Sequence, residues 1–73
     1  MKIIELNLVE MTWKGELIPS PYFVNVEYIV SFKREKQYNH HDEFLFEKTD
    51  INFLDGRRLS FTNTIPELLT LLK

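Results

Sequence analysis

Cysteine is absent from this chain of 73 residues, and its absence removes two common ways of stabilising a small domain. No disulfide can form, and no zinc site can use thiolate ligands. A domain of this size buries only about 60% of the surface that its unfolded chain exposes. We expect residues 1–73 to form a single domain that gains stability from a partner chain, and therefore a homo-oligomer.

Glycine and long apolar runs are also scarce. With only two glycines, the chain has no glycine-rich phosphate loop, and no nucleophile stands in a recognisable pairing with a base. Because so short a chain rarely encloses a substrate pocket, we expect no enzyme activity and no cofactor. No apolar run reaches the roughly 18 residues of a membrane span, and acidic residues interrupt the segment where a signal peptide would need an apolar stretch. We therefore expect a cytoplasmic protein.

Charge of one sign is lacking as well. Nine Lys and Arg residues face eleven Asp and Glu residues, for a net charge of −2. The chain as a whole therefore has no positive field that would draw nucleic acid. What it does have is apolar surface: 44% of the residues are hydrophobic, with six Phe, three Tyr and one Trp. This composition predicts a folded domain rather than a disordered one.

The N-terminal segment alternates between polar and apolar residues, but the alternation changes phase. Apolar residues first share one parity and then the other: Ile4, Leu6 and Leu8, followed by Val9, Met11 and Trp13. A bulge near Leu8–Val9 would bring both sets onto one core face. Alternatively, the strand is apolar on both faces and its second face meets another chain. The sequence leaves both interpretations open, and Lys14-Gly15 then ends the strand.

The middle of the chain predicts two further strands. Pro19 and Pro21 each remove a backbone donor, which indicates an extended connection or an edge segment. A β-branched and aromatic stretch follows, and then a charged loop centred on residues 39–42. The strand pattern resumes at Phe44. Because its apolar residues later change parity, we expect a bend or bulge near Lys48.

The segment 51–69 carries the most specific local pattern. A three-residue turn at 54–56, with Gly56 in the left-handed conformation, pairs Ile51 with Leu59 and Thr49 with Phe61. A two-residue turn would mix the two faces of the hairpin, so the three-residue turn is predicted.

A short helix follows the hairpin. Thr64 and Glu67 match a capping box, with Pro66 tolerated in the first turn. One apolar stripe completes the helix: Ile65, Leu68, Leu69 and Leu72. Because so short a helix is unstable alone, it must pack on the sheet or on a partner. The sequence predicts an α+β fold, with a small curved antiparallel sheet of four to five strands and one C-terminal helix packed on it.

The segment His40-His41-Asp42-Glu43 is the only cluster of metal-ligand residue types. Adjacent residues of an extended chain point to opposite sides, and no second pair exists to complete a ligand shell. We expect a solvated loop and no metal site.

Two surfaces remain as candidates for function. Aromatic and apolar residues of the first strand and the following connection form a candidate interface: Val9, Met11, Trp13, Tyr22 and Phe23. Basic residues form a candidate nucleic-acid contact: Lys33, Arg34, Lys36, Arg57 and Arg58. Because acidic residues are interspersed among these, we prefer to interpret them as a charged outer face that prevents edge aggregation.

The segments "VNVEYIVSF" and "TDINFLDGRRLSFTNTIPELLTLL" resemble small bacterial FlbD-like proteins of flagellar and swarming motility. The matching positions are Asn25, Ile29, Thr49, Ile51, Gly56, Glu67 and Leu72. The same succession is similar to the C-terminal half of LytTR-type DNA-binding domains. The FlbD-like resemblance implies a bacterial regulator without a known active site. We expect a small non-enzymatic interaction or regulatory module that acts as a homo-oligomer, or alternatively a LytTR-like nucleic-acid-binding regulator.

Overall fold

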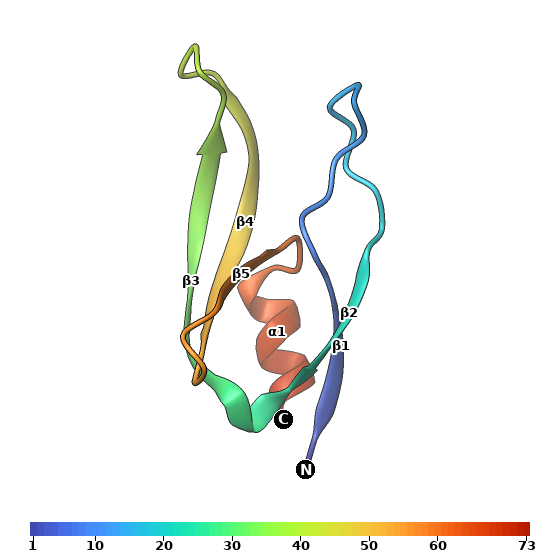
Figure 1. The fold of residues 1–73 in the computed structure, drawn as a ribbon, viewed down its shortest axis with the longest axis vertical. Coiled ribbons are helices and arrows are strands. Elements are labelled where there is room, and N and C mark those ends of the chain that lie inside the picture. The colour runs from blue at the N-terminus through green and yellow to red at the C-terminus, as the bar shows by residue number, and fades with distance from the viewer.

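A computed structural model describes residues 1–73 as an α+β fold with one C-terminal helix, as the sequence predicts. The elements are β1 (Ile3–Asn7), β2 (Pro21–Asn25), a 3-10 turn (Val26–Tyr28), β3 (Ile29–Tyr38), β4 (Phe44–Phe53), β5 (Arg58–Phe61) and α1 (Ile65–Leu72). All pairings are antiparallel. Figure 1 shows α1 lying between the β1–β2 hairpin and the β3–β4 hairpin, whose outer ends both extend beyond the helix.

The strands form two sheets, β1–β2 and β3–β4–β5, so the single sheet of four to five strands is not what the chain adopts. One bridge between Leu8 and Phe61 joins the two sheets. Val9 N donates to Ser60 O at 3.0 Å, and Thr62 N donates to Asn7 O at 2.8 Å. The ladder stops there because β5 ends at Phe61, where the chain turns towards α1.

The β1–β2 hairpin continues well beyond its two named strands. The register that pairs Ile3 with Asn25 also places Met11 opposite Leu17, and Thr12 N donates to Glu16 O at 2.8 Å. The tip is a tight turn in which Gly15 has a φ of 83°, a conformation that glycine adopts without steric cost. We call residues 9–19 the β1–β2 arm.

The phase change at Leu8–Val9 is not a bulge. Leu8 N donates to Ser20 O at 2.9 Å on one side, and Val9 N donates to Ser60 O on the other. Consecutive amides of a regular strand point in opposite directions in this way, with no extra residue between them. Leu8 packs against the core, whereas Val9 belongs to the opposite face, so the strand is apolar on both faces.

No bulge occurs near Lys48, although β4 is curved along its length (Figure 1). Lys48 pairs with Glu35 in an uninterrupted register, and the ladder shifts instead near the two ends of the β3–β4 hairpin, at Val30 and Leu45. Phe46 therefore lies on the face opposite Ile51. The change of parity separates the part of β4 that packs on α1 from the part that extends beyond it (Figure 1).

The turn at residues 54–56 is confirmed. Ile51 pairs with Leu59 and Thr49 pairs with Phe61. Gly56 has a φ of 89°, as the three-residue turn requires.

The helix cap is confirmed in part. Thr64 Oγ1 accepts from Glu67 N at 3.3 Å, but the Glu67 carboxylate accepts from Asn63 Nδ2 at 3.4 Å rather than from the cap amide. Leu68 is fully buried, whereas Leu69 is 48% exposed. The helix contacts the sheet over a narrower strip than the four-residue stripe, so the side of α1 that carries Leu69 is left in solvent.

The core is small. Nine of 73 residues are buried, and seven of these are apolar: Ile4, Leu6, Val24, Ile51, Phe53, Phe61 and Leu68. They come from four of the five strands and from α1, so one cluster ties both sheets to the helix. Many large apolar side chains consequently remain on the surface.

Candidate interaction surfaces

The tip of the β1–β2 arm carries the most exposed aromatic side chain of the molecule. Trp13 is 90% exposed, and Lys14 Nζ lies 5.2 Å from the centroid of its ring. Met11 and Leu17 lie opposite each other just below the tip and are both exposed. The arm therefore presents an apolar end that nothing in the chain covers.

Val9 lies at the base of the arm and is half-buried beside Ser60, whereas Tyr22 and Phe23 lie at the far end of the same hairpin. Phe23 is 68% exposed, because its neighbours Tyr22 and Val24 take the core side of β2. The Tyr22 ring packs on Phe61 at 6.1 Å between centroids. About seven residues of strand, or roughly 23 Å, separate this end from Trp13. The structure thus divides the five predicted residues into an arm group and a β2 group.

Pro19 and Pro21 protect the free edge of this hairpin. Leu8 bonds to Ser20, and Ile18 N donates to Glu10 O at 3.0 Å, so the even-numbered residues of this strand face β1. The two prolines occupy the alternate positions, which face outward and which lack a donor for an added strand. A partner is therefore directed to the face of the hairpin rather than to its edge.

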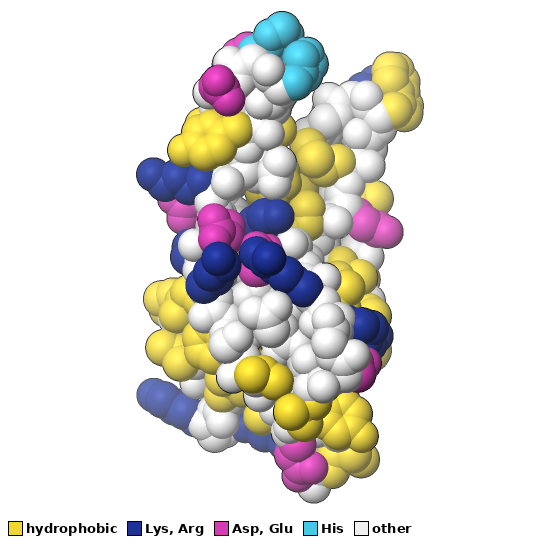
Figure 2. Space-filling view, turned by 60° about the vertical axis from the view of Figure 1, so that its left-hand side comes forward, with side chains coloured by type: hydrophobic (Ala, Val, Ile, Leu, Met, Phe, Trp, Pro, Cys, Tyr) yellow, Lys and Arg dark blue, Asp and Glu magenta, His cyan; other side chains and the backbone are white.

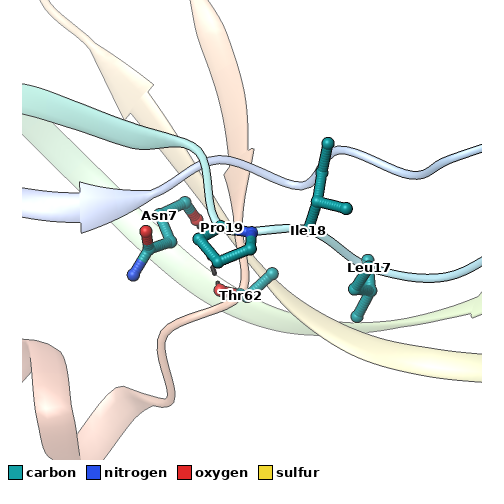
Figure 3. A pocket seen from close by; sticks show the side chains of 5 residues that line it. All are labelled: Asn7, Leu17, Ile18, Pro19 and Thr62. Carbon is teal, nitrogen blue, oxygen red and sulfur yellow. Dashed lines mark hydrogen bonds between the residues drawn. The ribbon is translucent and has the colours of Figure 1, made fainter.

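A hollow lies at the base of the arm, where the arm passes the end of β5. It has a volume of about 290 Å³ and is lined by Asn7, Leu17, Ile18, Pro19 and Thr62. Figure 3 shows these five side chains, with Asn7 and Thr62 joined through a hydrogen bond from Thr62 Oγ1 to Asn7 O at 3.4 Å. No charged side chain lines it, so the hollow suits an uncharged, largely apolar group.

A second groove lies farther along β1 and β2, on the side away from the arm, and was not foreseen from the sequence. Its volume is about 250 Å³, and its lining is Ile3, Tyr22, Phe23, Val24, Asn25, Tyr28, Phe53 and Arg57. Arg57 Nε donates to Asp55 Oδ2 at 2.6 Å, and Arg57 Nη1 donates to Tyr22 Oη at 3.1 Å. The hydrogen bond that Arg57 donates to the Tyr22 hydroxyl, together with the hydrogen bond to Asp55 and the charge of Asp55, raises the pKa of Arg57.

The structure does not gather the five predicted basic residues into one patch. Four of them pair with carboxylates: Lys33 with Glu35, Arg34 with Glu47, Arg57 with Asp55 and Arg58 with Asp50. Lys33 and Arg34 lie on opposite faces of β3 because successive residues of a strand alternate.

Arg34 also has a structural role. Its Nη1 donates to Thr49 Oγ1 at 2.9 Å and to Asn63 O at 3.1 Å. This guanidinium thereby ties β3 and β4 to the segment that leads into α1.

Asp50 is the one buried carboxylate, at 3% exposure. It accepts from Ser60 Oγ at 2.6 Å and from Arg58 Nη2 at 2.9 Å, and Lys48 Nζ lies 3.6 Å away. Burial opposes ionisation, but the two hydrogen bonds and the charges of Lys48 and Arg58 outweigh it and lower the pKa of Asp50. Figure 2 shows basic and acidic side chains close together on this side of the molecule.

The sequence contained a usable signal for this cluster. The register of the 54–56 turn places Asp50 opposite Ser60, on the face away from Ile51. All of the polar partners of Asp50 lie on that face, and its carboxylate therefore holds β4 and β5 together.

His40 and His41 lie in the exposed loop between β3 and β4, with ring centroids 4.0 Å apart. Asn39 Oδ1 shapes this loop by accepting from His41 N at 2.8 Å and from Glu43 N at 3.0 Å. The structure contains no group of three or more His, Asp or Glu side chains placed to hold a metal ion. It also contains no helix with the length and apolar character needed to cross a membrane.

Comparison with known proteins gives no match: no family model, curated protein or solved structure is significantly similar to this chain. The resemblance to FlbD-like and LytTR-type proteins therefore stays a prediction. The functional argument rests on the surfaces described above.

Proposed function

We propose that this chain is a non-enzymatic interaction module of the cytoplasm that acts as a homo-oligomer, with the β1–β2 arm as its contact surface. The observation that carries the proposal is Trp13, which is 90% exposed at the tip of the arm, above the exposed apolar pair Met11 and Leu17. Tryptophan is enriched at the energetic centres of protein interfaces, and a chain with seven buried apolar residues gains much from covering such a surface.

A second copy of the same chain is a suitable partner, because the arm carries both a projecting side chain and a hollow that could accept one. Trp13 projects from the tip, and the hollow of about 290 Å³ lies at the base of the same arm. If two arms run antiparallel about a two-fold axis, each Trp13 reaches the hollow of the other copy. Such a contact is closed and self-complementary, so it produces a dimer rather than a filament.

Sedimentation of the full chain over a range of concentrations tests this proposal. We expect the wild-type protein to reach twice its mass of 8.8 kDa and Trp13→Ser to remain monomeric. Leu54→Ser is the matched control, because Leu54 is 67% exposed in a hairpin turn outside the arm, and we expect it to dimerise like the wild type. A wild-type monomer at high micromolar concentration contradicts the proposal.

Nucleic-acid binding through Lys33, Arg34, Lys36, Arg57 and Arg58 remains the alternative. Pairing with carboxylates leaves Lys36 as the one of the five without an ion-pair partner. No structural observation therefore favours this alternative over self-association. A regulatory role, as the FlbD-like resemblance implies, is compatible with a dimer and forms part of the proposal.

A further inference from the structure

The groove beside Arg57 has a lining that is unusual for a random surface depression. Six of its eight residues are hydrophobic, and the only charged residue among the eight is a cation. The hydrophobic side chains come from β1, β2, the 3-10 turn and the end of β4. Residues far apart in the chain therefore converge on one apolar hollow with a positive charge in its wall.

Arg57 is held in place rather than free to move. Asp55 fixes one edge of the guanidinium, Tyr22 Oη accepts from Nη1, and the guanidinium carbon lies 5.7 Å from the centroid of the Phe53 ring. A guanidinium fixed on an aromatic ring loses little entropy when it binds a ligand, because its orientation is already set.

Donors remain unused around this fixed guanidinium. Arg57 Nη2 makes no hydrogen bond within the chain. The Tyr22 hydroxyl accepts from Arg57, so its own proton is free to be donated. Asn25 Oδ1 accepts from Glu27 N at 3.0 Å, and Asn25 Nδ2 makes no hydrogen bond within the chain. The groove therefore offers several donors and no carboxylate in its lining.

We propose that this groove binds a monocarboxylate carried on an aromatic or short aliphatic body. The carboxylate would accept from Arg57 Nη2 and the Tyr22 hydroxyl, and the body would lie against Ile3, Phe23 and Tyr28. A carboxylate suits the site better than a phosphate, because the neighbouring Asp55 offsets part of the positive charge and so disfavours a dianion. The volume of about 250 Å³ limits the ligand to a group about as large as one amino acid.

Titration of the ¹⁵N-labelled full chain with 3-phenylpropionate, followed by amide chemical shifts, tests the proposal. We expect saturable shifts at Phe23, Asn25 and Arg57. The uncharged analogue 3-phenylpropanamide should bind about tenfold more weakly, since hydrogen bonds to a charged group are worth about that much. Inorganic phosphate should cause no saturable shift at these amides.

Two variants assign the effect to the groove. Arg57→Gln should weaken binding of 3-phenylpropionate about tenfold or more. Tyr22→Phe should weaken it less, because it removes a single hydroxyl. Lys36→Gln is the matched control, since it removes one positive charge from β3 outside the groove, and it should bind like the wild type. Well-dispersed amide spectra will show whether each variant is folded. If Arg57→Gln does not fold, the binding of Tyr22→Phe and of the amide analogue still tests whether the carboxylate binds in the groove.

A peptide ending in Phe, compared with its amidated form, identifies the source of the carboxylate. Binding of the free acid alone assigns a small molecule, and binding of the free-terminus peptide as well assigns a peptide C-terminus. Equal affinity for 3-phenylpropionate and its amide, or unchanged binding by Arg57→Gln, overturns the proposal. Repeating the titration on Trp13→Ser separates the groove from self-association, because Trp13 lies at the other end of the hairpin.

Discussion

Replacing Asp50 by asparagine removes the negative charge that holds β4 and β5 together on the outer face of the larger sheet. The variant keeps the shape of the side chain and one oxygen that can accept from Ser60. It removes the charge that attracts Arg58 and Lys48, which lie 2.9 Å and 3.6 Å from the carboxylate oxygens.

The expected cost follows from how exposed each partner is. The Arg58 side chain is 53% exposed, so solvent screens its pairing, and its loss costs at most about 1 kcal/mol. The Ser60 hydrogen bond to a buried carboxylate is worth about 1.5–3 kcal/mol, of which the amide retains part. The free energy of unfolding should therefore fall by about 2 kcal/mol at neutral pH.

The pH dependence of the unfolding free energy provides a second test of the role of the Asp50 charge. The pKa of Asp50 is lower in the folded protein than its ordinary value of 3.8, so its ionised form stabilises the fold. This contribution is fully present above the unfolded pKa and is lost as the pH falls through the folded pKa. The Asp50→Asn variant lacks it, so the difference from the wild type should shrink in acid.

Urea unfolding at equal chain concentration, at neutral and acidic pH, measures both effects. Asp55→Asn is the control, because Asp55 is an exposed carboxylate of a turn and its replacement should cost much less. An Asp50→Asn variant as stable as the wild type at neutral pH, or a difference that grows in acid, would refute this reasoning.

Three further outcomes follow from the same structure. Gly56→Ala should lower the unfolding free energy by about 1–2 kcal/mol for backbone reasons alone, because a Cβ there meets no atom within 4 Å; urea unfolding measures this. Leu68→Ala, at 1% exposure, should cost about 2–5 kcal/mol and show as a large loss of thermal stability. Mixed-sequence DNA and RNA should not shift in gels at low salt, and a shift that disappears with added salt and with Arg58→Ala would support the nucleic-acid alternative.

The hairpin and helix of residues 51–69 were predictable because their determinants are local. Gly56 sets the turn, the turn sets the register, and the register places Ile51 opposite Leu59. Thr64 likewise begins the helix through a bond to an amide three residues on. Each step involves neighbours in the chain, so a single sequence is enough.

The arrangement of the sheets was not predictable from such local patterns. The two sheets meet through one bridge. The pairing of Leu8 with Phe61 depends on how far β5 extends before α1 begins. The register shifts at Val30 and Leu45 do not coincide with a change in the parity of the apolar residues, so the sequence pattern did not reveal them.

The candidate sites also include features that the local sequence predicts and features that only the three-dimensional structure reveals. The sequence singled out Trp13 and Phe23 as surface aromatics, and both are exposed, but it grouped them although the hairpin keeps them apart. It interpreted Arg57 only as part of a charged outer face, because Tyr22, its partner in the groove, is 35 residues away in the chain. Sites assembled by such distant contacts require the three-dimensional structure.

The fluorescence of Trp13 as a function of protein concentration tests the central claim most directly, since it is the only tryptophan in the chain. If each Trp13 enters the hollow of a second copy, its emission should shift from that of a solvated indole to shorter wavelength as dimers form. The midpoint should coincide with that of dimerisation in sedimentation. Emission that stays at the solvated position at every concentration, whether or not the protein dimerises, would contradict the arm-to-arm contact.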